Sequence, residues 1–158
     1  VMLAQLLGGG QSGYLTDKLV FGQQIATYTS AYYNGSSLDD TTFGVYAVPA
    51  PGVSLEDAET AMDDALASFI EDGVDPEALE RIKMQVRASQ VYDRDDVAGL
   101  AQMYGAALSQ GLTVSDIQAW PDILQAVQPD DIIAAAKQVL NRDNAVTGYL
   151  MSDKEVSQ

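Results

Sequence analysis

Most of the ionisable side chains in this sequence are carboxylates, and the sequence contains neither histidine nor cysteine. The 158 residues include 23 Asp and Glu but only 8 Lys and Arg. Without histidine or cysteine the chain cannot form a Ser-His-Asp triad, a Cys-His pair or a zinc site with nitrogen or sulfur ligands. A histidine general base is excluded for the same reason. Any chemistry must therefore use Asp, Glu, Lys, Tyr, Ser or Thr, and we assign no catalytic, cofactor-binding or metal-binding residue to this chain.

Two acidic clusters could in principle bind a hard cation. Asp39 and Asp40 are adjacent, and residues 93–96 have the sequence DRDD. Neither cluster has the ligand spacing or the central glycine of a calcium-binding loop. We therefore interpret both as solvated turn and capping charges. The remaining acids could supply pairs for general acid and base catalysis, but nothing in the sequence selects a pair.

A glycine-rich stretch at residues 8–13, with the sequence GGGQSG, has only a superficial likeness to a phosphate-binding loop. It follows a predicted helix rather than a strand, and it lacks the lysine that contacts phosphate in a P-loop. Three successive glycines favour a helix break with close backbone packing instead.

Aromatic side chains are concentrated in one short region, which forms the other candidate binding surface. This region carries Tyr28, Tyr32, Tyr33 and Tyr46. Tyrosines on a β-hairpin can stack on a ligand or accept a partner peptide along a strand edge. Cross-strand pairing and core packing explain them more simply, and we prefer that interpretation. Trp120, which precedes a proline, is interpreted as a packing anchor or as part of an interface.

Composition predicts one globular domain that does not bind anionic partners. Hydrophobic residues make up 47% of the chain, which is enough for one core. We assign residues 1–151 to this domain and residues 152–158 to a frayed tail. The formal net charge of −15 disfavours nucleic acid and anionic membrane surfaces as partners. No apolar run reaches the roughly 20 residues of a membrane span, and no signal-peptide pattern is present.

The first part of the chain is predicted to contain two helices followed by a β-hairpin. Residues 1–7 have apolar residues at helical spacing without a capping residue before them, so we expect the first residue to lie inside an element. A second helix follows the glycines. Residues 25–33 and 41–48 alternate strictly and are rich in β-branched and aromatic residues, so they predict two antiparallel strands.

The rest of the chain is predicted to be helical until a final strand. Ser54 and Gly73 bound one helix, and Asp75 caps the next. A capping box of Ser115 and Gln118 starts a shorter helix. Periodicity marks three further segments, namely helices over residues 97–111 and 129–140 and a last strand over residues 145–151. This order predicts an α+β fold in which several helices pack on one face of an antiparallel sheet.

Six segments, taken in order, resemble those of the insulinase or pitrilysin-like family of zinc peptidases, which includes the mitochondrial processing peptidase. LAQLLGGGQS at residues 3–12 resembles the helix and glycine break in the later part of a family repeat. The other segments are GVYAVPAPGVS at residues 44–54, PEALERIK at 76–83, YGAAL at 104–108, AVQPDDI at 126–132 and VTGYL at 146–150. Together they extend over nearly the whole chain.

The resemblance implies the fold of LuxS and processing-peptidase-like metallohydrolase domains, truncated here at its N-terminus so that the first strand is missing. It also implies tandem homologous α+β domains that form the two halves of a clamshell around a peptide-sized chamber. In the family, zinc is bound by an H-x-x-E-H motif and a further glutamate on the first domain. Because this chain has no histidine, the zinc that the resemblance implies belongs to another domain or subunit.

A second feature of the family is an arginine and a tyrosine, seven residues apart, that hold the substrate backbone in the half without zinc. Alignment of Leu19 and of Ile25-Ala26 with the family places Val20 at the arginine position and Thr27 at the tyrosine position. Both functional side chains are therefore replaced. The resemblance then implies that this domain follows the zinc-bearing domain in the catalytic subunit, with the Arg-Tyr pair on another domain or on a partner chain.

We therefore expect a non-catalytic C-terminal domain of a zinc-dependent metallopeptidase, which forms chamber wall and interdomain interface. Its expected partners are a homologous zinc-bearing domain or subunit, in a homo- or heterodimer, and the peptide substrate of the assembled enzyme. An alternative is a catalytically inactive scaffold subunit with the same fold. A third possibility is a free-standing binding module that uses the tyrosine-rich hairpin. For location we favour the periplasm or export over the cytoplasm.

Overall fold

The computed structural model describes residues 1–35, 37, 39–93 and 96–151, with the backbone alone described for residues 90–93. The predicted tail at residues 152–158 lies outside the described residues. The elements follow in the order α1 (Met2–Gly8), η1 (Gly10–Ser12), η2 (Thr16–Gly22), β1 (Ala26–Tyr33), β2 (Phe43–Pro49), α2 (Leu55–Asp72), α3 (Pro76–Asp93), α4 (Val97–Ser109), α5 (Val114–Ala126), α6 (Pro129–Val139) and η3 (Arg142–Asn144). Of these, η1 and η3 are 3-10 turns and η2 is a short π-helix.

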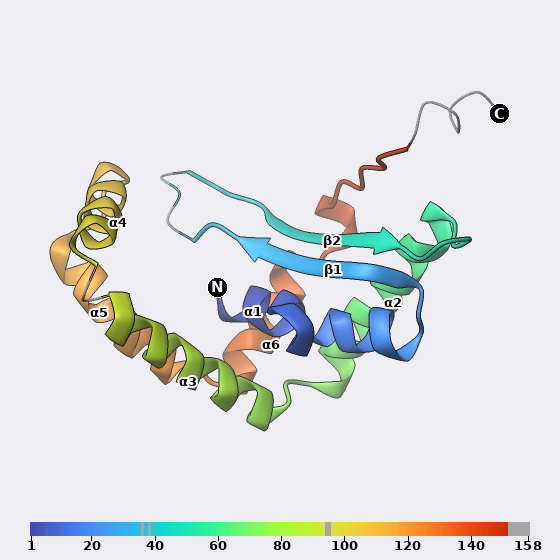
Figure 1. Ribbon diagram of the computed structural model, residues 1–158, viewed down its shortest axis with the longest axis horizontal. Coiled ribbons are helices and arrows are strands. Elements are labelled where there is room, and N and C mark those ends of the chain that lie inside the picture. Colours follow the sequence, from blue (N-terminus) through green and yellow to red (C-terminus); the bar gives the residue numbers. More distant parts are fainter. Residues whose placement is uncertain (36, 38, 94–95, 152–158) are drawn as a thin grey trace.

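The predicted α+β fold is confirmed, with an antiparallel sheet of β1 and β2 and helices packed on one face of it. In Figure 1, α1 lies below the sheet, and α2 descends from the end of β2 to a position below it. Both α1 and η2 contact β1, whereas α2 contacts β2. In turn, α6 packs against α1 and α2. The sheet and these helices therefore form two layers with a core between them.

The core lies between the sheet and the helices, with α1, η2, α2, α3, α5 and α6 all contributing buried side chains. The large side chains that are fully buried there are Leu7, Leu15, Leu19 and Leu79. Two polar side chains share this core, because the hydroxyl oxygens of Thr16 and Thr29 lie 2.9 Å apart. Thr16 also donates to the Gly10 carbonyl at 3.0 Å, so Thr29 is the donor within the pair. These bonds satisfy the buried hydroxyls and connect η2 to β1.

The strict alternation predicted for residues 25–33 is wrong near the start of β1. The pairing register with β2 changes by one residue between Ala26 and Tyr28. Thr27 is therefore an extra residue in the strand, a β-bulge that reverses the side-chain alternation. As a result Ala26 and Thr29 are both buried, at 4% and 3% exposure, although strict alternation places them on opposite faces.

The last strand predicted over residues 145–151 is not formed. Ala145 leaves η3 with extended backbone angles, but the sheet pairs only β1 with β2 within the described residues. Val146 and Leu150 are 99% and 90% exposed. Side-chain alternation predicts an extended segment, whereas a strand also needs a neighbour that supplies backbone hydrogen bonds.

Helix capping follows the sequence prediction in α2 and departs from it in α5. Ser54 accepts a backbone amide of the first turn at 3.0 Å, and Gly73 ends α2 with a φ of 83°, as predicted. The capping box predicted from Ser115 is wrong, because Thr113 and Asp116 form it instead. The Asp116 carboxylate accepts the Thr113 amide at 2.8 Å. Threonine is a good N-cap residue, so the helix begins before Ser115.

Three helices extend from the two-layer body. Packing proceeds outward, with α3 on α1, α5 on α3 and α4 on α5. In Figure 1, α4 lies at the end of α3 that is remote from α2. None of the helices in the described part of the chain is both long enough and apolar enough to cross a membrane.

Candidate functional site

The glycine-rich stretch packs a helix end against the sheet. A Cβ atom added to Gly8 would lie 2.0 Å from the backbone nitrogen of Ala31 in β1, so only glycine allows α1 to approach the strand this closely. Gly10 has a φ of 71°, a conformation that glycine adopts readily. The predicted helix break with close packing is thus confirmed.

The donor set of this chain does not fit the zinc ion that the family resemblance implies. Within residues 1–35, 37, 39–93 and 96–151, no group of three or more His, Cys, Asp or Glu side chains is arranged to hold a metal. Asp39 and Asp40 are exposed, and Asp96 caps α4 by accepting the Gly99 amide at 3.0 Å. Residues 94 and 95 of the second acidic cluster lie outside the described residues. Since histidine and cysteine are also absent from the sequence, the usual zinc ligands are missing.

The tyrosines of the hairpin lie on its surface rather than in the core. Their exposures are 54%, 60%, 40% and 50% for Tyr28, Tyr32, Tyr33 and Tyr46. The rings of Tyr28 and Tyr46 meet edge to face with centroids 6.2 Å apart, which confirms the predicted cross-strand pairing. The predicted core packing is wrong, because each of the four side chains is at least 40% exposed.

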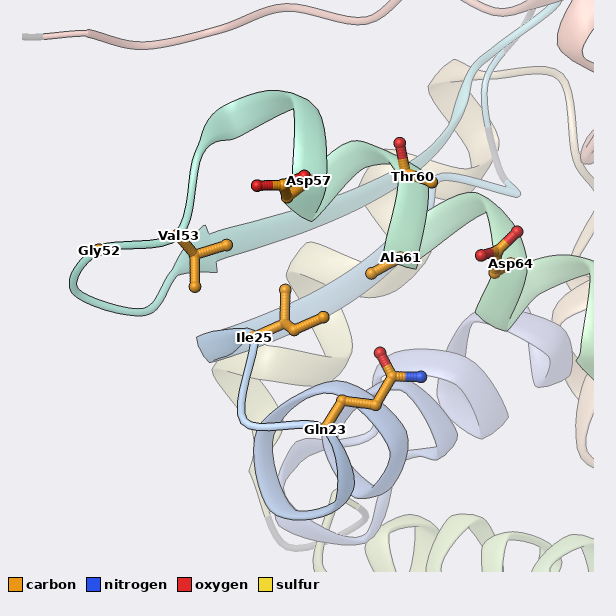
Figure 2. A pocket seen from close by; sticks show the side chains of 8 residues that line it. All are labelled: Gln23, Ile25, Gly52, Val53, Asp57, Thr60, Ala61 and Asp64. Carbon is orange, nitrogen blue, oxygen red and sulfur yellow. The ribbon is translucent and has the colours of Figure 1, made fainter.

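Val20 and Thr27, which the resemblance places at the family's arginine and tyrosine positions, both contact other parts of the described fold. Val20 packs partly buried against the core, and the Thr27 hydroxyl donates to a carbonyl of β2 at 3.3 Å. Ile25, close to Thr27, lines an open depression of about 430 Å³ between the start of β1 and α2. Figure 2 shows the side chains that line it, which include Asp57 and Asp64 but no Lys or Arg. The depression therefore lacks the cationic donor that the family uses to hold a peptide backbone.

A cluster around Glu59 fastens the segment after α6 to α2. Arg142 donates to Glu59 at 2.9 Å and forms an ion pair with Asp63 at 3.0 Å. Thr147 donates to the same oxygen of Glu59 at 2.8 Å, and the Tyr149 hydroxyl donates to its other oxygen. The donors lie more than 80 residues after Glu59, so no local sequence pattern indicates this cluster.

These contacts favour the ionised form of Glu59. The hydrogen bond from Tyr149 is the largest cause, followed by those from Thr147 and Arg142, and they lower the pKa of Glu59 from 4.5 to about 2. The same bond raises the pKa of Tyr149. A general acid or base needs a pKa near the working pH. Glu59 is therefore a structural anion at neutral pH.

The feature best suited to contact another protein is an apolar surface formed by α4, α5 and the loop at residues 110–113, hereafter the apolar arm. Residues 97–115 contain no charged side chain, in a chain where 20% of residues are charged. Seven large apolar side chains of the arm are between 39% and 78% exposed, namely Val97, Met103, Leu108, Leu112, Val114, Trp120 and Ile123. The buried residues of α4 and α5 are Ala107 and Leu124. Many exposed apolar side chains on two adjacent helices are typical of a protein interaction site.

Comparison with protein families identifies the first part of the chain. Residues 1–86, more than half of the sequence, match the family model described as the peptidase M16 inactive domain. No curated protein is significantly similar to the chain in sequence.

Solved structures share the fold across most of the chain. The inactive peptidase domain of a candidate zinc protease from Bordetella parapertussis matches with a TM-score of 0.80 at 20% identity, over 94% of this chain and 80% of that one. A protease from Helicobacter pylori matches with a TM-score of 0.77 at 17% identity, over 89% of this chain and 33% of that one. The chain thus spans about one third of the length of the Helicobacter pylori protease. The TM-scores show a common fold. The match to the family model shows that the chain belongs to the family of peptidase M16 inactive domains, as the resemblance to insulinase-like zinc peptidases predicted.

Proposed function

We propose that this chain is the non-catalytic C-terminal domain of a zinc-dependent metallopeptidase, where it forms chamber wall and an interdomain interface. Its partner is a homologous domain or subunit that carries the H-x-x-E-H motif and hydrolyses the peptide. The exposed apolar arm is the single observation that carries this proposal. The fold shared with the inactive domain of a candidate zinc protease supports it.

Energetics favour burial of the apolar arm against another domain. Complete burial of one large aliphatic side chain contributes about 1.5–3 kcal/mol, and each of the seven side chains is at least 39% exposed. Because residues 97–115 carry no charge, a partner can cover them without desolvating an ion. Trp120 and Ile123 are three residues apart on α5, so they lie on one face of that helix. Tryptophan is also the residue type most enriched among those that dominate binding energies.

The contribution of this chain to hydrolysis is structural. Its sequence lacks histidine and cysteine, and Glu59 is committed to holding the segment after α6. A wall domain of this kind excludes bulk water from the chamber and restricts the positions that a bound peptide can take.

Zinc content and peptide hydrolysis test this function. They are measured for this chain alone and for the longer protein or complex that contains its zinc-bearing homologue. We expect neither zinc nor cleavage from the chain alone, and stoichiometric zinc with chelator-sensitive cleavage from the assembly. Absence of both from the assembly would instead support a scaffold subunit of the same fold. Cleavage by the isolated chain would contradict a non-catalytic role.

Substitution within the arm tests the interface. We expect Ile123→Asp to weaken association with the homologous domain by about tenfold or more, because a charge would be buried at the centre of an apolar contact. The matched control is Phe21→Asp, which changes a 61% exposed apolar side chain on η2, outside the arm. Affinity is measured by analytical ultracentrifugation, with circular dichroism to verify the fold. Equal affinity of the two variants would contradict the arm as the interface.

A further inference from the structure

The chain contains three asparagines, and all of them are exposed, namely Asn34, Asn141 and Asn144. The backbone nitrogen of the residue that follows an asparagine can attack the side-chain amide, so the identity of that residue matters. Glycine follows Asn34, arginine follows Asn141 and alanine follows Asn144. Because glycine has no Cβ, its nitrogen is the least hindered of the three. Equal exposure therefore does not imply equal reactivity.

The backbone amide of Gly35 is well placed to act as a nucleophile. Asn34 directly follows the last residue of β1, and neither Asn34 nor Gly35 belongs to a helix or strand. None of the described residues accepts a hydrogen bond from the Gly35 amide. The nitrogen therefore breaks no hydrogen bond to a described residue when it attacks, and no regular backbone structure opposes the movement.

The other two asparagines are restrained by the turn η3. The amide of Ala145, which is the corresponding nucleophile for Asn144, donates to the Arg142 carbonyl at 3.2 Å. The side-chain oxygen of Asn141 accepts the Asp143 amide at 3.1 Å. Each bond restrains one of the two groups that would have to meet. The three positions thus share exposure but differ in the freedom of the reacting groups.

We propose that Asn34 is a site of spontaneous deamidation, with water as the co-reactant. The Gly35 nitrogen forms a bond to Cγ of Asn34, and the bond from Cγ to Nδ2 breaks. Nδ2 leaves as ammonia with the proton that Gly35 loses, which closes a five-membered succinimide ring. Water then adds to either carbonyl of the ring and opens it to aspartate or isoaspartate. No atom is oxidised or reduced. This site does not depend on the peptidase assignment.

The modification changes both the charge and the length of the turn between β1 and β2. It adds one negative charge to a loop that already carries the exposed Asp39 and Asp40. Isoaspartate also routes the main chain through Cβ and Cγ, which adds one atom to the backbone. Because the turn sets the register of a hairpin, this product disturbs the adjacent pair of Tyr33 and Phe43, the last pair of the sheet.

Incubation of the folded chain at mildly alkaline pH, in water enriched in ¹⁸O, tests the site. Peptide mapping by mass spectrometry follows the loss of the amide and the gain of ¹⁸O at each asparagine. Electron-transfer fragmentation distinguishes isoaspartate from aspartate. We expect Asn34 to be converted about tenfold or more faster than Asn141 or Asn144, with both products at residue 34. Equal rates at the three positions, or aspartate alone at residue 34, would overturn the proposal.

Gly35→Ala tests the nucleophile. Gly35 has no positive φ, and the nearest neighbours of an added Cβ would be side-chain atoms of Tyr33 and Val1, at 3.1 and 3.3 Å. We expect the conversion of Asn34 to slow by about tenfold, because the methyl group hinders the nitrogen. Gly148→Ala is the matched control, since its Cβ would meet nothing within 4 Å, and it should leave the rate unchanged. Circular dichroism verifies the fold of both variants. An unchanged rate in Gly35→Ala, or an equal slowing in Gly148→Ala, would refute the assignment.

Discussion

The helix that opens the chain and the helix at the tip of the apolar arm are both rich in apolar residues, yet they differ sharply in burial. Five of the seven residues in α1 are buried, namely Met2, Leu3, Ala4, Leu6 and Leu7. The longer α4 buries Ala107 alone. Apolar sequence therefore does not by itself define a core, because burial depends on what the rest of the chain places against it. One region lies in the core, whereas the other leaves most of its apolar side chains exposed, where we propose that a partner covers them.

Replacing one leucine in each region by alanine should give the largest difference in stability between the two regions. Leu7 is fully buried, so we expect Leu7→Ala to lower the free energy of unfolding by about 2–5 kcal/mol. Leu108 is 48% exposed, so Leu108→Ala should lower it by less than about 1 kcal/mol. Urea denaturation followed by far-ultraviolet circular dichroism measures both. Similar losses would show that the arm is part of the core.

Two helical glycines provide a second pair with effects of opposite sign. A Cβ at Gly8 would collide with the backbone of β1, so Gly8→Ala should destabilise the protein by about 1–3 kcal/mol. A Cβ at Gly105 in α4 would meet nothing within 4 Å, so Gly105→Ala should stabilise it by about 0.5–1 kcal/mol. The same denaturation experiment decides the sign. A stabilising Gly8→Ala would disprove the close contact between α1 and β1.

Low pH should detach the segment after α6 from α2. Of the effects predicted here, this one involves the smallest change in free energy. Because the pKa of Glu59 is lowered from 4.5 to about 2, its contacts are fully formed above about pH 4.5 and are lost as the pH falls through about 2. The ring resonances of Tyr149 report this detachment in an NMR titration from pH 6 to pH 1. A midpoint near pH 4.5 would contradict the cluster.

Glu59→Gln removes the charge, so Tyr149 should give the detached resonance throughout that titration. Glu71→Gln, which changes an exposed acid on the same helix, serves as the matched control and should keep the low midpoint. If both variants behave alike, Glu59 has no special role.

Local sequence signals predicted the elements whose limits depend on neighbouring residues. Ser54 and Gly73 bound α2 because a cap and a left-handed glycine act within one turn. The hairpin likewise followed from two alternating segments. By contrast, the bulge at Thr27 and the missing strand at residues 145–151 depend on which strand lies alongside, and alternation carries no such information.

Long-range contacts explain what the sequence did not reveal about candidate sites. The cluster at Glu59 joins residues that are far apart in the chain, so no local sequence pattern could reveal it. Trp120 was interpreted as a packing anchor or an interface residue, and its 43% exposure in the arm favours the interface. The absence of histidine and cysteine, in contrast, could be read directly, and it excluded the usual zinc ligands at once.

The central claim is that the apolar arm meets another domain, and the single tryptophan of the chain tests it most directly. Incorporation of 5-fluorotryptophan gives one ¹⁹F resonance, from residue 120, whatever tryptophans an unlabelled partner contains. For the chain alone we predict a clear solvent isotope shift between H₂O and D₂O, because Trp120 is 43% exposed. On assembly with the homologous zinc-bearing domain, the resonance should move and lose that isotope shift. An unchanged resonance in a complex verified by sedimentation would show that the interface lies elsewhere and would contradict the account.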